Sequence, residues 1–417
     1  MRWKLLMLAA GTLLGLAIGE AALRLLDIHR PYFYQYDDRR GWALKPGAEG
    51  WQDGEGKAWI HVNSAGYRDR ERSVEKTPGT YRIAIVGDSY SDAYQVPLES
   101  TYWSELERTL NQRMTDTGRN VEVLNFGVRG YGTAQELLTF QQDVRSYNPD
   151  LVLLQITTEN DIVENSPVLN TKAANCPFYR IDQGRLTLDL SFADARALGI
   201  RMGDWYRAYL GLRDRLRIAE VIDLDAIYDK FIEFKRSRER KRKGEESDLL
   251  GGLVTFTASY VRPDAPELAS AWEVTQLLLL EMKTAVAETG ASFAIVTLSN
   301  PIQVFPDAAV RKRFMDSISI DDLFYADNRI RKFCADHDVP VITLAPRLQQ
   351  IADRDGVFLH GFANTPPGDG HWNESAHAIA GQIIANEILK WWQSVPANQG
   401  TKTDADRPPQ SNAAPGP

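Results

Sequence analysis

At 417 residues the chain is long enough for one large domain or two smaller ones, which excludes a small scaffold held together by disulfides. Its hydrophobic content of 43% and charged content of 25% are those of an ordinary globular protein, so most of the chain is expected to fold. The net charge of -8 argues against a general nucleic-acid binder, because such a protein needs a surplus of Lys and Arg to neutralise phosphates.

The N-terminus carries the pattern of an export signal. Two basic residues precede an apolar stretch from Leu5 to Ile18, which predicts that the N-terminus stays in the cytoplasm while the rest of the chain crosses the membrane. Extending the stretch to Leu26 reaches the roughly 20 residues that a membrane span needs. We expect residues 1–26 to be an uncleaved signal anchor with an extracytoplasmic, periplasmic or extracellular, domain behind it. Cleavage near Gly19, followed by secretion, is the alternative.

Strands and helices are predicted to alternate after residue 80. Residues 27–80 are rich in Gly, Trp, Tyr and turn signals and are expected to form a stalk with short strands. Helical patterns follow from Leu98 to Met114 and from Thr133, where Glu136 would complete a capping box. Three largely apolar runs suit parallel strands buried on both faces: 82–86, 121–126 and 151–156. This order predicts a doubly wound α/β fold.

The alternation pauses over residues 166–265, which we interpret as an insertion, and resumes with strands at 292–298 and 339–344. The sheet domain therefore comprises residues 81–165 and 266–395. Within the insertion, the basic run Lys235–Lys243 fits a solvated helix end, with contact to anionic lipid or acidic polysaccharide as the alternative. The last helix is expected to start after Asn373 as its N-cap, and residues 396–417 have the composition of a disordered tail.

Cys176 and Cys334 are the only cysteines. Because the sequence has no CxxC pair, it predicts neither a zinc ribbon nor a thioredoxin-like site, and no motif indicates a redox cofactor. Outside the cytosol the two residues could form a disulfide, but Cys334 equally fits a buried thiol in a helical pattern.

Ser89 is the candidate nucleophile. The turn Gly87-Asp88-Ser89 follows directly on the strand 82–86, at the edge of the sheet where ligands bind in open α/β folds. The turn alone is weak evidence, but the next two strands also end in polar groups. The main-chain N–H of Gly130 and the side-chain amide of Asn160 could donate to a developing oxyanion without adding charge.

His371 is the best candidate for a general base among six histidines. It lies in a loop just before the last helix, and Asp369 lies two residues upstream, where a carboxylate could orient the imidazole. His360 is interpreted as a satisfied structural histidine, and His377, inside the last helix, as a packed or exposed residue. A metal-dependent phosphoesterase would use Asp369, His371 and His377 as ligands, but such a centre normally gathers further His or carboxylate ligands.

Four segments resemble, in order, the conserved blocks of SGNH (GDSL-type) hydrolases: Gly-Asp-Ser, Asn-x-Gly-x-x-Gly, x-x-Asn-Asp and Asp-x-His-Trp. The resemblance spans residues 81–392 without the insertion. It implies a flavodoxin-like sheet of order 2-1-3-4-5, a structural role for Asp88 and no metal or organic cofactor. The site residues that it implies are Ser89 as nucleophile, His371 as base, Asp369 as its orienting acid, and Gly130, Asn160 and the Ser89 amide as the oxyanion hole.

Two departures from the family pattern bear on the substrate. Thr158 replaces the glycine usual in the third block, and one residue instead of two separates Asp369 from His371. The second spacing, with Trp372, resembles the branch that acetylates or deacetylates exported polysaccharides. The segment Asn63–Asp69 behind an N-terminal anchor resembles SGNH proteins of polysaccharide assembly systems.

We therefore expect ester hydrolysis or acyl transfer, in particular acetyl transfer, through an acyl-serine. The substrate would be an extracytoplasmic carbohydrate or another small ester, with polysaccharide-assembly proteins as partners. Whether water or a sugar hydroxyl accepts the acyl group stays open. The alternative is a non-catalytic glycan-binding or scaffold subunit of an envelope assembly system.

Overall fold

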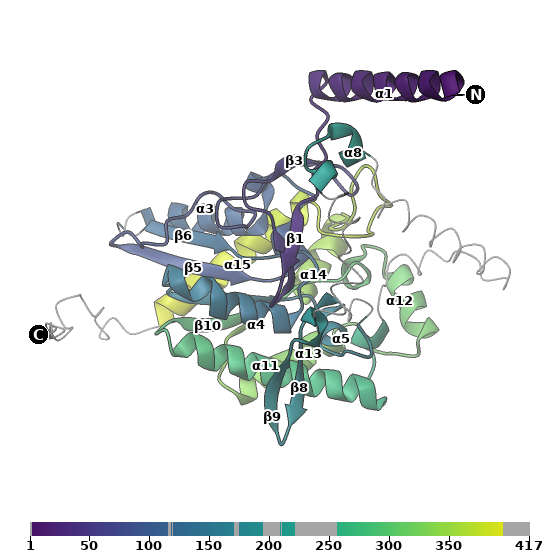
Figure 1. The fold of residues 1–417 in the computed structure, drawn as a ribbon. Helices are drawn as coiled ribbons and strands as arrows, with labels where there is room; N and C mark the ends of the chain where they lie inside the picture. Colours follow the sequence, from purple (N-terminus) through teal and green to yellow (C-terminus); the bar gives the residue numbers. More distant parts are fainter. Residues whose placement is uncertain are drawn as a thin grey trace, which may run out of the picture.

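The computed structural model describes residues 2–115, 118, 120–170, 175–194, 209, 211–221 and 257–394. The basic run Lys235–Lys243, the expected tail 396–417 and much of the expected insertion lie outside these residues. A central sheet is surrounded by helices, and the N-terminal helix projects from this body (Figure 1).

Five parallel strands form the central sheet. In chain order they are β5 (Thr80–Val86), β6 (Asn120–Asn125), β7 (Leu151–Ile156), β10 (Ser292–Thr297) and β11 (Val341–Thr343). Their order across the sheet is β11-β10-β7-β5-β6, and each neighbouring pair is parallel. Numbered along the chain, this is the order 2-1-3-4-5, which confirms the predicted doubly wound, flavodoxin-like fold class.

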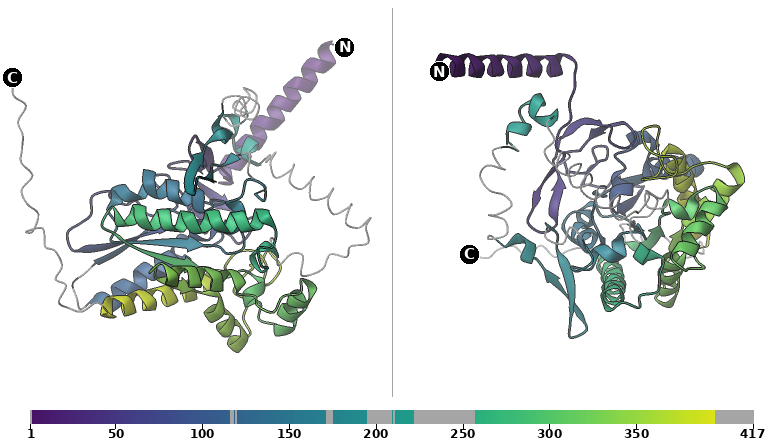
Figure 2. Two further views of the ribbon diagram at one scale, coloured as in Figure 1. Left: turned by 90° about the horizontal axis from the view of Figure 1, so that it is seen from below. Right: turned by 90° about the vertical axis from the view of Figure 1, so that its right-hand side faces the viewer.

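Both faces of the sheet are buried, which explains why its strands are continuous apolar runs. Along β5, Ala84 and Val86 belong to one buried apolar cluster, whereas Ile83 and Ile85 belong to another on the opposite face. Helices α4 (Thr133–Gln142) and α11 (Pro266–Ala287) cover the first face (Figure 2). Helices α3 (Tyr102–Met114) and α15 (Glu374–Ser394) cover the second. The remaining helices of the sheet domain include α5 (Asp161–Glu164), α12 (Ala308–Ser317), α13 (Tyr325–Asp336) and α14 (Ala345–Asp355).

The ends of two predicted helices can be compared with the structure. Helix α15 follows Asn373, whose Oδ1 accepts a hydrogen bond from Ala376 N (3.1 Å), as predicted for an N-cap. Helix α4 begins at Thr133, but its capping box differs from the prediction. The Gln135 side chain, rather than Glu136, accepts from the N–H of the N-cap Gly132 (3.3 Å). Glu136 is instead fully buried.

The segment expected to be a stalk packs on the sheet domain. It forms two antiparallel hairpins, β1 (Tyr34–Asp37) with β2 (Gly41–Leu44) and β3 (Glu49–Gln52) with β4 (Ala58–His61). Phe33, Leu44 and Ile60 from this segment are buried in the same apolar cluster as the side chains of β5 and β7. This segment is therefore a layer on the sheet domain and not the expected stalk, because these side chains form part of the domain's core.

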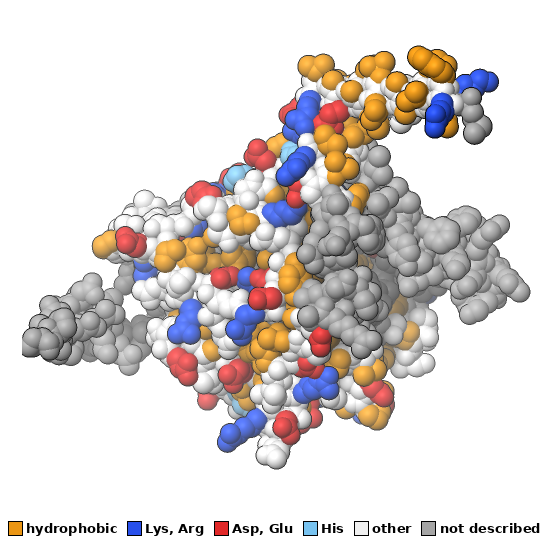
Figure 3. All heavy atoms as spheres, viewed as in Figure 1, with side chains coloured by type: hydrophobic (Ala, Val, Ile, Leu, Met, Phe, Trp, Pro, Cys, Tyr) orange, Lys and Arg blue, Asp and Glu red, His pale blue; other side chains and the backbone are white. Residues whose placement is uncertain are grey.

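Helix α1 (Arg2–Leu25) carries its apolar side chains on an exposed surface (Figure 3). It is long and apolar enough to cross a membrane, a test that signal sequences also pass. At its end, the Glu20 carboxylate accepts from Ile218 N (2.9 Å) in the short helix α8 (Arg217–Val221), which belongs to the expected insertion.

Two strands of the expected insertion, β8 (Phe178–Asp182) and β9 (Arg185–Asp189), form a further hairpin. Cys176 just before it and Cys334 in α13 are both buried, and no disulfide joins these two residues. The Cys176 sulfur instead accepts from the Asn170 side-chain amide (3.6 Å).

Candidate active site

Ser89 lies at the carboxyl end of β5, in the first turn of the four-residue helix α2 (Ser89–Asp92). The Asp88 side chain caps this helix by accepting from Tyr90 N (3.0 Å), consistent with the structural role expected for it. A Cβ on Gly87 would lie 2.2 Å from Gln155 Oε1 and 2.7 Å from Ser91 Oγ, so a larger residue there would require these side chains to shift. The turn leaves Ser89 partly exposed at the sheet edge, although its neighbours are buried.

Ser89, His371 and Glu55 form one chain of hydrogen bonds. Ser89 Oγ lies 2.9 Å from His371 Nε2, and His371 Nδ1 lies 2.6 Å from Glu55 Oε2. An ionised carboxylate can only accept, so the network assigns the ring proton to Nδ1 and leaves Nε2 to accept from the serine hydroxyl. A base that faces a hydroxyl and is oriented by a carboxylate is the arrangement of a serine nucleophile with its activating pair.

The carboxylate at His371 is Glu55, not Asp369 as expected from the sequence. Asp369 Oδ1 accepts from the N–H of Gly370 (2.8 Å), its own chain neighbour. Gly370 has a φ of 77°, and a Cβ there would lie 2.1 Å from Glu55 Oε1, so the missing side chain makes room for Glu55. The sequence did not single out Glu55, because it lies in a turn between two short strands with no motif around it.

The charge state of Glu55 follows from its surroundings. Burial alone would raise its pKa, but the hydrogen bonds and charge of His371 outweigh this effect and lower the pKa below its ordinary value. Glu55 is therefore a carboxylate at neutral pH. Burial raises the pKa of Asp369, and the Glu55 charge adds to that increase.

One side chain ties the Glu55 turn to the loop that carries His371. Asn364 Oδ1 accepts from Gly56 N (3.0 Å), while Asn364 Nδ2 donates to Asp53 O (2.9 Å) and Gly56 O (3.0 Å). The acid and the base are thus held together through main-chain contacts as well as through their own hydrogen bond.

A second histidine supports the His371 loop from inside. His360 is buried, and its Nδ1 lies 2.7 Å from the carbonyl oxygen of Gly370, while its Nε2 lies 3.2 Å from Ser299 Oγ. Trp372 Nε1 donates to the same Ser299 oxygen (2.8 Å). Ser299 therefore supports the residues on both sides of His371, Trp372 directly and Gly370 through His360. Burial lowers the pKa of His360 to about 4, so the ring is neutral at physiological pH.

His377 is packed, which is one of the two arrangements expected for it. Its ring stacks on that of Tyr102, and its Nδ1 accepts from Tyr102 N (3.2 Å). The three residues considered as metal ligands therefore have separate partners. Among the residues that the structure describes, no group of three or more His, Cys, Asp or Glu side chains is arranged to hold a metal ion.

Gly130 lies in a loop whose preceding residue, Arg129, is held at both its carbonyl and its N–H. Gly130 itself has a φ of 79°, in the region that favours glycine. The Trp42 indole donates to the carbonyl oxygen of Arg129 (3.0 Å), and the N–H of Arg129 donates to Asp92 Oδ2 (3.2 Å). Because Arg129 O and Gly130 N belong to one planar peptide, Trp42 fixes the direction of the Gly130 N–H.

The Asn160 amide faces carboxylates. Its Nδ2 donates to Glu164 Oε2 (3.0 Å) and to Asp161 Oδ1 (3.3 Å), so both of its hydrogens have acceptors here. Thr158, which replaces the usual glycine of this block, is buried, and its hydroxyl accepts from the Asn300 amide (3.3 Å).

Two carboxyl groups near Asn160 are fully buried. Burial raises the pKa of Asp161 well above its ordinary value, and the neighbouring Glu136 carboxyl raises it further. The pKa of Glu136 is raised by burial and by the nearby Asp88. Burial and mutual repulsion thus act in the same direction on these two carboxyl groups, against their carrying negative charge together.

A comparison with protein families finds a similarity over part of the sheet domain. The model of the family described as GDSL-like Lipase/Acylhydrolase matches residues 83–183, from β5 to the hairpin β8–β9. Residues 83–183 are thus similar to GDSL-like lipases and acylhydrolases. Ser89, Gly130 and Asn160 lie within the matched residues, whereas Glu55 and His371 lie outside them.

One curated protein similar to this chain is an arylesterase of Vibrio mimicus, which is 32% identical over 75 residues. The match covers 18% of this chain and 36% of the relative, so the chain spans about a third of the length of the curated protein it matches.

Solved structures similar to this chain include the acetyl xylan esterase AlAXEase, with 14% identity, 74% and 98% of the two chains covered and a TM-score of 0.35. Another is the psychrotrophic esterase EstA from Pseudoalteromonas sp., with 12% identity, 75% and 98% covered and a TM-score of 0.32. These scores are too low to decide the fold, which rests on the strand order of the central sheet.

Proposed function

We propose that this protein hydrolyses or transfers the acyl group of an ester through an acyl-serine at Ser89. The observation that carries this proposal is the unbroken chain of hydrogen bonds from Ser89 Oγ through His371 to Glu55, with lengths of 2.9 and 2.6 Å. The match of residues 83–183 to the GDSL-like Lipase/Acylhydrolase family model supports the reaction class.

The proposed reaction has two halves. His371 Nε2 takes the proton of Ser89 Oγ as that oxygen attacks the ester carbonyl carbon, and the Glu55 carboxylate stabilises the imidazolium that forms. The carbonyl is restored when the bond to the leaving alcohol breaks, and His371 returns its proton to that alcohol. Water or a sugar hydroxyl then repeats these steps on the acyl-serine and releases Ser89.

The negative charge of the tetrahedral intermediate needs donors that already point at it. We propose the main-chain N–H groups of Ser89 and Gly130 as two of them. The contact of Trp42 with Arg129 supports the role of Gly130, because it fixes the peptide that carries this N–H. Asn160 would be a third donor if one of its amide hydrogens exchanges a carboxylate acceptor for the substrate oxygen.

For the substrate, we propose an acetylated carbohydrate or another small ester outside the cytoplasm. The N-terminal apolar helix supports an extracytoplasmic, membrane-tethered site, with a cleaved signal as the alternative. The Asp-x-His-Trp spacing around His371 supports a polysaccharide substrate by its resemblance to the polysaccharide acetylation branch of the family. Mass spectrometry of products formed from an acetyl donor and an oligosaccharide separates hydrolysis, which yields acetate alone, from transfer, which yields an acetylated sugar.

The core of the proposal is tested with a chromogenic acetyl ester and a fluorophosphonate probe, applied to the wild-type protein and to Ser89→Ala. Turnover and covalent labelling are expected in the wild type and should both be lost in the variant. A matched control is Ser146→Ala, because this serine lies on the exposed turn after α4 and donates only to Asp143 O (2.6 Å). Equal turnover by wild type and Ser89→Ala would refute the proposal, and a wild type that neither turns over esters nor reacts with the probe would favour a non-catalytic subunit.

A further inference from the structure

The segment Asn63–Asp69 lies against the turn that carries Ser89. It follows strand β4 and is compact: Asn63 Oδ1 accepts from Ala65 N (3.1 Å) and from Tyr67 N (3.0 Å). Asp69 Oδ2 accepts from Asn125 N (3.1 Å) at the end of β6, and the Asn125 side chain donates back to Arg68 O (3.0 Å). The segment is thus fixed to the sheet at Arg68 and at Asp69.

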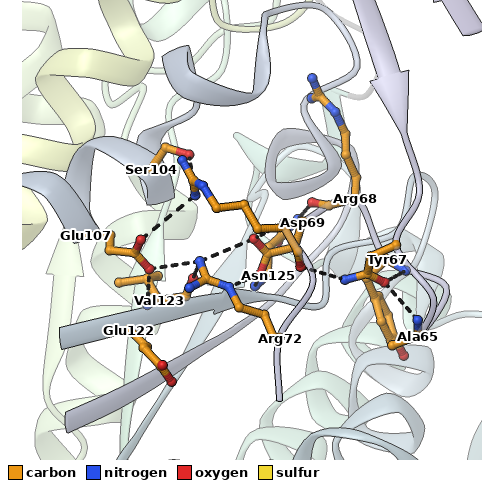
Figure 4. Close-up of polar contacts among 12 residues, drawn as sticks. Ala65, Tyr67, Arg68, Asp69, Arg72, Ser104, Glu107, Glu122, Val123 and Asn125 are labelled. Atoms are coloured by element: carbon orange, nitrogen blue, oxygen red, sulfur yellow. Dashed lines mark hydrogen bonds and ion pairs between the residues drawn. The ribbon is translucent and has the colours of Figure 1, made fainter. Parts of the chain in front are cut away.

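The side chain of Arg68 points away from its neighbours in this network. Asp69 is paired with Arg72, which also reaches Glu107, whereas the Arg68 guanidinium extends in the other direction (Figure 4). Arg68 is fully buried, and its Nη1 donates to Asp92 O (2.9 Å) and to Ala93 O, while its Nη2 donates to Val96 O (2.6 Å).

The carbonyls of Asp92 and Ala93 lie at the C-terminal end of α2, and that of Val96 lies in the turn that follows. Helix α2 has only four residues, and Ala93, which ends it, has a φ of 51° that non-glycine residues rarely adopt. Such a conformation persists only where surrounding contacts impose it. The planar fork of an arginine, with its five N–H donors, suits several carbonyls in one plane.

We propose that Arg68 is a positioning residue of the catalytic site, because its guanidinium holds the α2 turn that carries Ser89. The inference rests on the proposed role of Ser89 as nucleophile. Although burial lowers the pKa of Arg68 to about 10, the guanidinium is still charged at neutral pH. A buried charge whose hydrogen-bond partners are main-chain carbonyls of one turn is costly for stability alone, which favours a role in fixing that turn.

The same contact reaches the proposed oxyanion loop. Asp92, whose carbonyl Arg68 binds, accepts from the N–H of Arg129 through its side chain (3.2 Å). Movement of Asp92 would therefore shift Arg129, the residue before Gly130, as well as Ser89. Loss of Arg68 is expected to misplace the nucleophile and an oxyanion donor together.

Arg82 in β5 provides a matched control. It is buried to within 1% exposure, and its guanidinium also binds main-chain carbonyls, Tyr147 O (2.7 Å) and Val74 O (3.1 Å). It also forms an ion pair with Glu122 (2.8 Å), and it differs in location, since it lies near the amino end of β5 whereas Ser89 follows the carboxyl end. Arg68→Lys and Arg82→Lys thus make the same chemical change, and only the first touches the Ser89 turn.

The experiment measures amide hydrogen exchange of the peptide covering residues 88–97 and the rate of fluorophosphonate labelling. In full-length Arg68→Lys we expect faster exchange at Asp92, Ala93 and Val96, and labelling slowed about 10²-fold, the cost of displacing reacting groups by about 1 Å. Arg82→Lys should label within about twofold of the wild type, with unchanged exchange in this peptide.

Unchanged exchange in Arg68→Lys, or labelling at the wild-type rate, would overturn the proposal. A wild type that the probe does not label would contradict the acyl-serine function alone, and hydrogen exchange would then still decide whether Arg68 holds the turn. Arg68→Ala provides a second variant: if it folds, its labelling should be at least as slow as that of Arg68→Lys, and faster labelling would contradict the proposal.

Discussion

Replacement of Glu55 by glutamine tests which carboxylate serves His371. The substitution keeps the size of the side chain and a hydrogen-bonding oxygen but removes the charge that faces the imidazolium in the proposed transition state. Glu55 Oε2 lies 2.6 Å from His371 Nδ1, and the two side chains are only 19% and 21% exposed. Glu55→Gln is therefore expected to lower kcat while leaving the fold intact.

The size of the effect follows from the distance between the charges. Taking charge centres about 4 Å apart and an effective dielectric constant of about 20, the attraction is about 4 kcal/mol. At about 1.4 kcal/mol for each factor of ten, this corresponds to a loss of about 10³ in kcat. The carboxylate acts on the imidazolium rather than on the substrate, so KM should change little.

The assay compares kcat and KM for a chromogenic acetyl ester among wild type, Glu55→Gln and Asp369→Asn. Because Asp369 binds its own loop instead of His371, Asp369→Asn should stay within about threefold of the wild type. The reasoning would be refuted if Glu55→Gln kept more than about a tenth of the wild-type kcat while Asp369→Asn lost about 10³. Thermal unfolding of both variants provides the control for folding.

Three further outcomes are expected. Trp42→Phe removes the hydrogen bond that holds the peptide between Arg129 and Gly130. It should lower kcat by less than the roughly 10²-fold that loss of an oxyanion donor costs, and it should leave KM unchanged. An equal change in kcat and KM would contradict this prediction. Burial lowers the pKa of His377 to about 3. Between pH 6.5 and 3 the unfolded chain therefore binds a proton that the folded protein does not, so the free energy of unfolding decreases as the pH is lowered through this range. In urea unfolding, the difference in free energy of unfolding between the wild type and His377→Gln should decrease by about 1.4 kcal/mol per pH unit below 6.5. Parallel pH profiles of the two proteins would contradict this prediction. Gly127→Ala would place a Cβ 2.3 Å from that of Ser91 and should cost about 1–3 kcal/mol in urea unfolding; wild-type stability would mean that α2 can move aside.

The fold could be predicted because its signals are local. Each strand of a parallel sheet buried on both faces has to be a short apolar run, and such runs identified β5, β6 and β7 to within two residues. The turn after β5 had to be tight and polar, which singled out Ser89. His371 was found in the same way, as a histidine in the loop before the last helix.

Other expectations depended on contacts between distant segments. Residues 27–80 have the short strands and turns expected of a stalk, and nothing local distinguishes a stalk from a layer that packs on the sheet. The burial of Phe33 and Ile60 in the main core makes it a layer. Glu55 is missing from the sequence-based site for the same reason, since it lies 316 positions from its partner His371.

The sequence by itself determined the sheet, its strand order through the family resemblance, and the positions of Ser89 and His371, because strand periodicity and the turn chemistry at strand ends are properties of neighbouring residues. Only the tertiary structure decided which carboxylate orients the base. A carboxylate two residues away along the chain was the natural prediction, but the turn at Gly370 leaves Asp369 bound to its own loop and opens the space that Glu55 fills. Orientation of a catalytic base is a matter of distance in space, and a chain folded into layers brings a remote turn closer than a near neighbour.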